Sequence, residues 1–88
     1  MSETQVRMQP TPNPNSMKFV FNKTIVPAGM EMFNNQAEAE KSPIARQLFE
    51  IEGVESVFMM KDFISVNKTG SGSWGVMSSQ IIDILKKL

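Results

Sequence analysis

The segment Val54-Glu55-Ser56-Val57-Phe58-Met59-Met60-Lys61-Asp62-Phe63-Ile64-Ser65-Val66-Asn67 contains two runs rich in β-branched and aromatic residues, separated only by Lys61-Asp62. This pattern predicts an antiparallel β-hairpin. A two-residue turn would sort the apolar side chains into two groups, with Val57, Met59, Ile64 and Val66 on one face and Phe58, Met60 and Phe63 on the other. A three-residue loop would regroup them, but either register leaves large apolar side chains on both faces.

Earlier in the chain, alternating apolar and polar residues indicate further strands. The alternation runs from Thr4 to Gln9 and stops at Pro10 to Asn15, where proline at every second position favours a stiff, exposed loop. It resumes from Ser16 to Phe21, which predicts a second strand. Ala28 to Phe33 predicts a short third strand, and the polar stretch Asn34 to Lys41 predicts a loop or a frayed turn.

Two segments have the apolar spacing of amphipathic helices. The first begins at Ser42-Pro43, a capping side chain followed by a ring preset to helical φ, and Gly53 supplies a left-handed stop. Its apolar stripe comprises Ile44, Ala45, Leu48, Phe49 and Ile51. The second follows a flexible loop, Gly70 to Gly75, and its stripe comprises Met77, Ile81, Ile84, Leu85 and Leu88.

In chain order the expected elements are β-β-(β)-α-β-β-α. This order predicts an α+β fold with two layers, a mainly antiparallel sheet of four or five strands covered on one face by two helices. A chain of 88 residues buries only about 60 to 65% of its unfolded surface, which leaves no material for two separate cores. We therefore expect residues 1–88 to form a single domain.

Composition excludes several classes of function. The chain has no Cys and no His, which excludes thiolate nucleophiles, disulfides, zinc-finger sites and Ser-His triads, and we expect no cofactor or metal. Nine basic residues balance nine acidic ones, so nucleic acid is not an expected partner. The segment Met1 to Gln9 has no signal-peptide pattern and no apolar run approaches a membrane span, so we expect a soluble, cytoplasmic protein that does not bind membranes.

Two patterns with catalytic connotations are better explained without catalysis. Gly70 to Gly75 matches G-x-G-x-x-G, but a dinucleotide fold needs a second parallel strand and an acidic residue about 20 positions later, and neither follows here. Glu50 and Glu52 flank Ile51 and do not share a helix face, which indicates solvated surface and not an acid–base pair. A carboxylate-dependent enzyme is therefore the least favoured hypothesis, and we expect no enzymatic activity.

Methionine is abundant, with eight residues in the chain. Unbranched thioethers fill irregular cores and also make adaptable binding surfaces. Met8, Met17, Met30 and Met77 lie on apolar stripes and are expected in the core. If helices cover only one face of the sheet, Phe58, Met60 and Phe63 lie on the open face as a docking surface. The alternative is that a loop or the N-terminal segment covers them.

A second candidate site is the start of the helix at Ser42. Free backbone amides at this end, with Arg46 one turn into the helix, would hold an anionic group of a small ligand or phosphopeptide. Lys18 and the loop that carries Asn13 and Asn15 would lie nearby. The alternative is an ordinary capped helix with a surface arginine.

Several blocks of the chain together are similar to one family. These blocks are Pro10-Thr11-Pro12-Asn13-Pro14-Asn15-Ser16-Met17-Lys18-Phe19, Ser42-Pro43-Ile44-Ala45-Arg46-Gln47-Leu48-Phe49, Ile51-Glu52-Gly53-Val54, Val57-Phe58 and Asp62-Phe63-Ile64-Ser65-Val66. Over roughly Gln5 to Leu88, the chain resembles the N-terminal domain of Nfu/NifU-type iron–sulfur scaffold proteins. Met60-Lys61 departs from the Gly-Pro turn that this resemblance implies.

The resemblance implies a module that precedes a cluster-carrying C-x-x-C domain and contacts other assembly factors or recipient proteins. Without cysteine, this chain cannot hold a cysteine-ligated cluster itself. We therefore expect a non-enzymatic protein-binding module, accessory to iron–sulfur cluster assembly or delivery. The candidate partner-binding residues are Asn13, Asn15, Lys18, Ser42, Arg46, Phe58, Met60 and Phe63.

Overall fold

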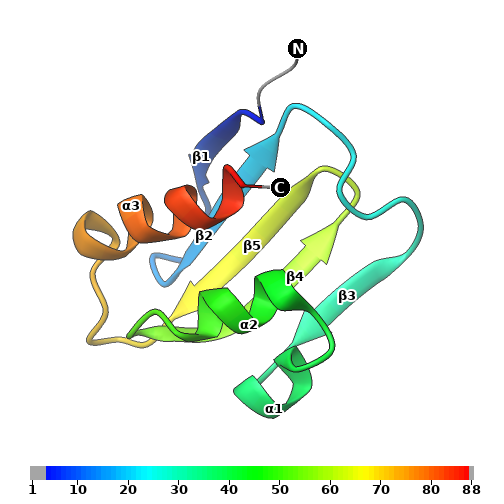
Figure 1. Ribbon diagram of the computed structural model, residues 1–88. Coiled ribbons are helices and arrows are strands. Elements are labelled where there is room, and N and C mark those ends of the chain that lie inside the picture. Colours follow the sequence, from blue (N-terminus) through cyan, green and yellow to red (C-terminus); the bar gives the residue numbers. More distant parts are fainter. Residues whose placement is uncertain (1–3, 88) are drawn as a thin grey trace.

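A five-stranded antiparallel sheet forms one layer of the protein, seen here in a computed structural model that describes residues 4–87 (Figure 1). The elements in chain order are β1 (Val6–Pro10), β2 (Ser16–Phe21), β3 (Met30–Phe33), α1 (Gln36–Ala39), α2 (Pro43–Phe49), β4 (Val54–Met60), β5 (Phe63–Lys68) and α3 (Trp74–Leu85). The strand order across the sheet is β1-β2-β5-β4-β3, so β1 and β3 are the edges. The predicted α+β fold, with two helices on one face of an antiparallel sheet, is confirmed.

The central hairpin, β4 and β5, has the two-residue turn. Met60 pairs with Phe63 across Lys61-Asp62, and the pairing continues through Met59↔Ile64 and Val57↔Val66. Lys61 has φ 40°, a left-handed conformation that an L side chain adopts at a cost. The carbonyl oxygen of Lys61 accepts hydrogen bonds from the backbone N–H groups of Ile25 and Val26, at 2.6 and 3.0 Å. The turn therefore also anchors the segment between β2 and β3.

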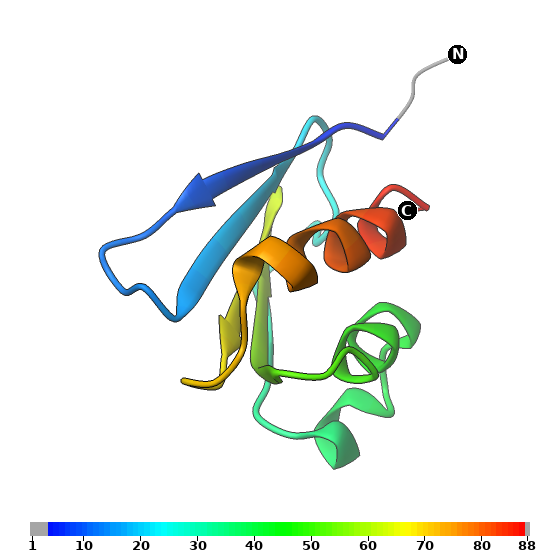
Figure 2. The same ribbon diagram turned by 90° about the vertical axis from the view of Figure 1, so that its left-hand side faces the viewer.

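Helices α2 and α3 lie on the same side of the sheet (Figure 2). At the start of α2, the Ser42 hydroxyl oxygen accepts a 3.3 Å hydrogen bond from the backbone N–H of Ala45, and Pro43 occupies the first turn. The helix ends at Phe49, earlier than its predicted stripe, which reached Ile51. Gly53 has φ 102° in the turn that leads into β4, where a Cβ would be strained.

The core lies between the helices and the covered face of the sheet. Its fully buried large side chains are Phe19, Leu48, Val57, Ile64, Val66, Ile81 and Leu85. Each such side chain contributes about 1.5–3 kcal/mol on leaving water. The face of the hairpin predicted from Val57, Met59, Ile64 and Val66 is the one that is buried here. The sheet and two helices together thus enclose one hydrophobic core.

The segment Asn34 to Lys41, expected as a loop or frayed turn, contains the short helix α1. Its start is held by two reciprocal hydrogen bonds. The Asn35 side-chain oxygen accepts from the Glu38 N–H at 2.9 Å, and a Glu38 carboxylate oxygen accepts from the Asn34 N–H at 3.0 Å. This resembles a capping box, whose Asn-x-x-Glu spacing is visible in the sequence.

Two further expectations need correction. Helix α3 begins at Trp74, so the predicted Gly70 to Gly75 loop is too long and Gly75 lies in the first helical turn. Met30 was expected in the core but is 60% exposed, because its pairing with Met60 places it on the uncovered face. Met17 and Met77 are buried and Met8 is half-buried against the core. Leu88, part of the predicted stripe, lies outside the described residues.

Candidate docking surface on the open sheet face

The sheet face opposite α2 and α3, here called the open face, carries a group of large apolar side chains. This group, the Met–Phe patch, comprises Met30, Met32, Phe58, Met60 and Phe63. Its three methionines are 60, 51 and 42% exposed in chain order, and both phenylalanines are half-buried. The alternative interpretation of the sequence required a loop or the N-terminal segment to cover this group. Within residues 4–87, no segment covers the patch.

Strand register arranges the open face in rows that cross the sheet. One row runs from β3 to β1 through Met30, Met60, Phe63, Val20 and Arg7. The next runs through Met32, Phe58, Ser65, Lys18 and Gln9. A third, polar row comprises Ser56, Asn67 and Ser16. The face is thus apolar at the β3 edge and cationic toward β1, and these rows contain no carboxylate.

Ring contacts fix the middle of this face. The rings of Phe58 and Phe63 have centroids 6.1 Å apart, on neighbouring strands. The Lys18 ammonium nitrogen lies 4.2 Å from the centroid of the Phe63 ring, within cation–π range. The structure therefore brings together four of the sequence-predicted residues, Lys18, Phe58, Met60 and Phe63, on one continuous surface.

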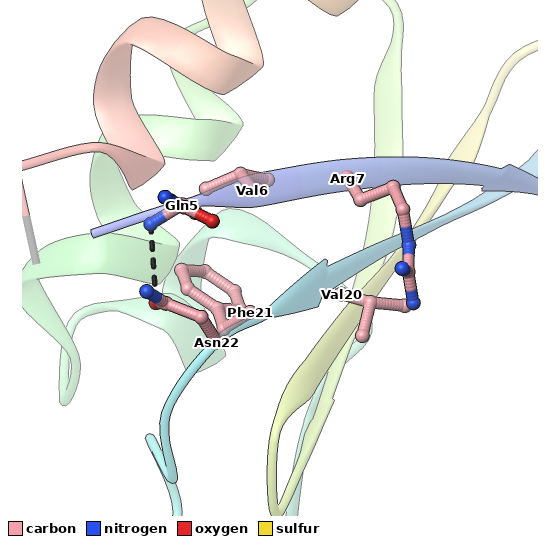
Figure 3. A pocket seen from close by; sticks show the side chains of 6 residues that line it. All are labelled: Gln5, Val6, Arg7, Val20, Phe21 and Asn22. Carbon is pink, nitrogen blue, oxygen red and sulfur yellow. Dashed lines mark hydrogen bonds between the residues drawn. The ribbon is translucent and has the colours of Figure 1, made fainter. Parts of the chain in front are cut away.

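A shallow hollow of about 200 Å³ marks the cationic end of the first row (Figure 3). Arg7 and Val20, which are register partners, lie side by side there. At the other end of the hollow the backbone N–H of Gln5 donates to the Asn22 side-chain oxygen at 3.1 Å. Arg7 and Val20 were not among the predicted site residues, although their alternation with Val6 and Phe21 in the sequence places them on the uncovered face.

The Asn13 and Asn15 loop is bound to other elements of the fold. The Asn13 side-chain oxygen accepts from the Asn15 N–H at 2.9 Å, and the Asn15 side-chain oxygen accepts from the Lys68 ammonium group at 2.9 Å. The indole N–H of Trp74 donates to the Pro14 carbonyl at 2.9 Å. These bonds tie the β1–β2 hairpin to β5 and to the start of α3, so the loop has a structural role.

The residues of the predicted anion site are not brought together. Ser42 caps α2 and Arg46 lies within it, in the helix layer. Lys18 alternates with the buried Met17 and Phe19 and therefore faces the other way. The Ser42 hydroxyl is occupied as the cap of α2, and its carbonyl accepts from the Arg46 N–H at 2.9 Å. Arg46 itself is exposed. What remains at this end is a short capped helix with a surface arginine.

The Gly70 to Gly75 segment lies beside a hollow of about 470 Å³ that Glu52, Gly53, Gly72 and Met77 help to line. A Cβ at Gly53 or at Gly72 would lie 3.0 Å from the Met77 sulfur. Gly53 and Gly72 therefore allow the Met77 side chain to pack between the segments, and this packing accounts for Gly72 of the G-x-G-x-x-G motif without a nucleotide. Within residues 4–87, His, Cys, Asp and Glu side chains do not gather in any group of three or more that would hold a metal.

None of the helices in the described residues has the length and apolar character needed to cross a membrane.

A family model described as the N-terminal part of the scaffold protein Nfu/NifU matches residues 6–88. The human NFU1 iron–sulfur cluster scaffold homolog, a protein named as mitochondrial, is 44% identical over 77 residues. That match covers 86% of this chain but only 30% of the human protein.

Solved structures agree with this match. The solution structure of a NifU-like protein from Saccharomyces cerevisiae has a TM-score of 0.86 and 28% identity, covering 97% of this chain and 77% of that one. A protein from Staphylococcus epidermidis has a TM-score of 0.65 and 30% identity, covering 99% and 98% of the two chains. The cytoplasmic location expected from the sequence stays a prediction. The chain belongs to the Nfu/NifU scaffold-protein N-terminal family.

Proposed function

We propose that this chain is a non-enzymatic module that binds protein partners during iron–sulfur cluster assembly or delivery, with the Met–Phe patch as its contact surface. The single observation that carries the proposal is the exposure of Met30, Met32 and Met60 on a sheet face that no described element covers. Contiguous apolar surface of this kind is costly in water and marks interaction sites. Methionine side chains also adapt to differently shaped partners.

The family context supports one class of partner, proteins that take part in iron–sulfur cluster assembly or delivery. The chain spans about three tenths of the length of the human relative, whose name describes an iron–sulfur cluster scaffold. This chain contains no cysteine, so thiolate ligands for a cluster must come from another protein or another domain. Partners with such ligands, or proteins that receive clusters, are therefore the ones expected to contact the patch.

The proposal can be tested by amide-resolved NMR titration of the labelled chain with purified cluster-assembly proteins, including a separate C-x-x-C domain. We expect shifts at Phe58, Met60 and Phe63 and at the neighbouring β3 amides. Met60→Gln should weaken binding, whereas Val76→Gln, a matched change of an exposed apolar residue on α3, should not. Binding that leaves these amides unchanged, or shifts confined to Ser42 and Arg46, would contradict the proposal.

A further inference from the structure

We infer that a partner protein binds the open face through an acidic amphipathic segment. Its apolar side chains would lie over the Met–Phe patch and its carboxylates over Lys18 and Arg7. This inference rests on the proposed docking function and adds the chemistry of the partner. It follows from the graded character of the face, which is apolar at β3 and β4 and cationic at β2 and β1.

The cations of this face are available to a partner. Arg7 is exposed and Lys18 is half-buried, with its ammonium group over the Phe63 ring. Within the described part of the chain neither forms an ion pair. Glu31, the acidic residue of β3, pairs with Met59 and so points to the opposite face. Glu55, the acidic residue of β4, lies at the register shift between Val54 and Ser56 and so belongs to neither of the rows that contain Lys18 and Arg7. A partner's carboxylate placed over Lys18 or Arg7 therefore meets positive charge in rows that contain no carboxylate of their own.

The positions of Lys18 and Arg7 determine how a bound partner is oriented on the open face. Lys18 lies next to the aromatic centre of the patch, since it contacts Phe63, and Arg7 lies beside Val20 in the same row as Met60. A segment whose apolar side chains cover the methionines must therefore continue past Val20 to reach Arg7. Charges at the rim of an apolar contact set the orientation and the association rate of the partner.

A second copy of this chain fits the face less well. Two copies stacked through their open faces about a two-fold axis would place cations opposite cations or opposite methionines, depending on the axis. Neither arrangement supplies a carboxylate to Lys18 or Arg7. A nucleic acid is also disfavoured, because the chain has no net charge and the face carries only these two cations in its rows.

The test uses a synthetic amphipathic peptide that carries leucine and phenylalanine on one side and glutamate at its margin, together with a matched peptide in which every glutamate is glutamine. Binding to the full chain is measured by fluorescence anisotropy. We expect the glutamate peptide to bind at least about ten-fold more tightly, and to lose this advantage when NaCl rises from about 50 to about 500 mM. The double variant Arg7→Gln/Lys18→Gln should reduce its affinity to that of the glutamine peptide.

The control is Lys41→Gln/Arg46→Gln, which removes two exposed cations outside the open face and should change neither affinity. Thermal unfolding of both double variants confirms that they are folded. The inference would be overturned by equal affinity for the two peptides or by an equal effect of the control variant. It would also be overturned by tighter binding of a single-stranded oligouridylate or by concentration-dependent dimerisation through the patch. If assembly proteins shift the patch amides but the charge variants bind them normally, the docking function stands and this inference fails.

Discussion

The two faces of the sheet are built from the same strands, yet their neighbouring residues have opposite environments. Met59 is buried at 5% exposure beneath the helices, and the next residue, Met60, is 42% exposed on the open face. Both are methionines in one strand, so residue type does not distinguish them. The alternation of the strand relative to the helix layer decides which side chain supports the fold and which is available to a partner.

The largest expected effect contrasts these two adjacent methionines. Met59→Ala should lower the free energy of unfolding by about 2–4 kcal/mol, because it removes packed atoms from the core and leaves a cavity. Met60→Ala should lower it by less than about 1 kcal/mol, since the residue is 42% exposed on the open face and its truncation leaves no enclosed cavity. Urea denaturation measures both. Similar losses in the two variants would mean that the open face is packed in solution.

The helix layer can be weakened at its cap. Ser42→Ala should cost about 1 kcal/mol, because the Ala45 N–H loses its side-chain acceptor at the start of α2. Ser73→Ala is the matched control, since Ser73 precedes α3 without a side-chain capping bond and should have a much smaller effect. Thermal or urea unfolding of the two variants gives the comparison, and an equal loss in both would show that the Ser42 cap has no special role.

The turn that joins the two central strands offers a stabilising change. Lys61→Gly should raise the free energy of unfolding by about 0.5 kcal/mol, because glycine adopts the left-handed conformation at φ 40° without steric cost and this gain exceeds its extra unfolded-state entropy. Gly29→Ala makes the opposite change at φ 71°, where a Cβ has open space, and should be destabilising. A loss of stability in Lys61→Gly would show that the lysine side chain supports the turn.

Mild oxidation with hydrogen peroxide should have the smallest effect on the free energy of unfolding. It also measures directly which face of the sheet is open. Met30, Met32 and Met60 should form sulfoxides before Met17, Met59 and Met77, because the first three residues are exposed and the last three are buried. Peptide mass spectrometry after a time course gives the order. Oxidation of Met59 as early as Met60 would contradict the burial of the covered face.

Much of this architecture could be predicted from local patterns. The β4–β5 hairpin, its two apolar groups and the Ser42-Pro43 helix start follow from alternation, turn length and capping chemistry. Phe58, Met60 and Phe63 were placed correctly on one side. Alternation cannot say which side the helices cover, however, and for this reason Met30 was assigned to the core although it belongs to the patch.

The contributions of β1 and β2 to the open face were harder to predict. Lys18 comes near Phe63 only because β2 pairs with β5, a neighbour distant in the sequence. The same long-range pairing places Arg7 in the row of Val20 and Phe63. Strand order is a property of the whole sheet and is not contained in local sequence patterns. For this reason the sequence predicts Lys18 near Ser42 and Arg46 instead.

The hydrogen bond from the Trp74 indole to the Pro14 carbonyl joins residues 60 positions apart. Strand β2 likewise pairs with β5, which comes much later in the chain. During synthesis the β1–β2 hairpin therefore leaves the ribosome long before its lateral neighbour and its helical cover exist. Its apolar residues Phe19 and Phe21 remain in water through that interval, when nascent chains associate most readily with chaperones or with one another. The order of strands in the sheet thus makes the first hairpin the segment most dependent on completion of the chain.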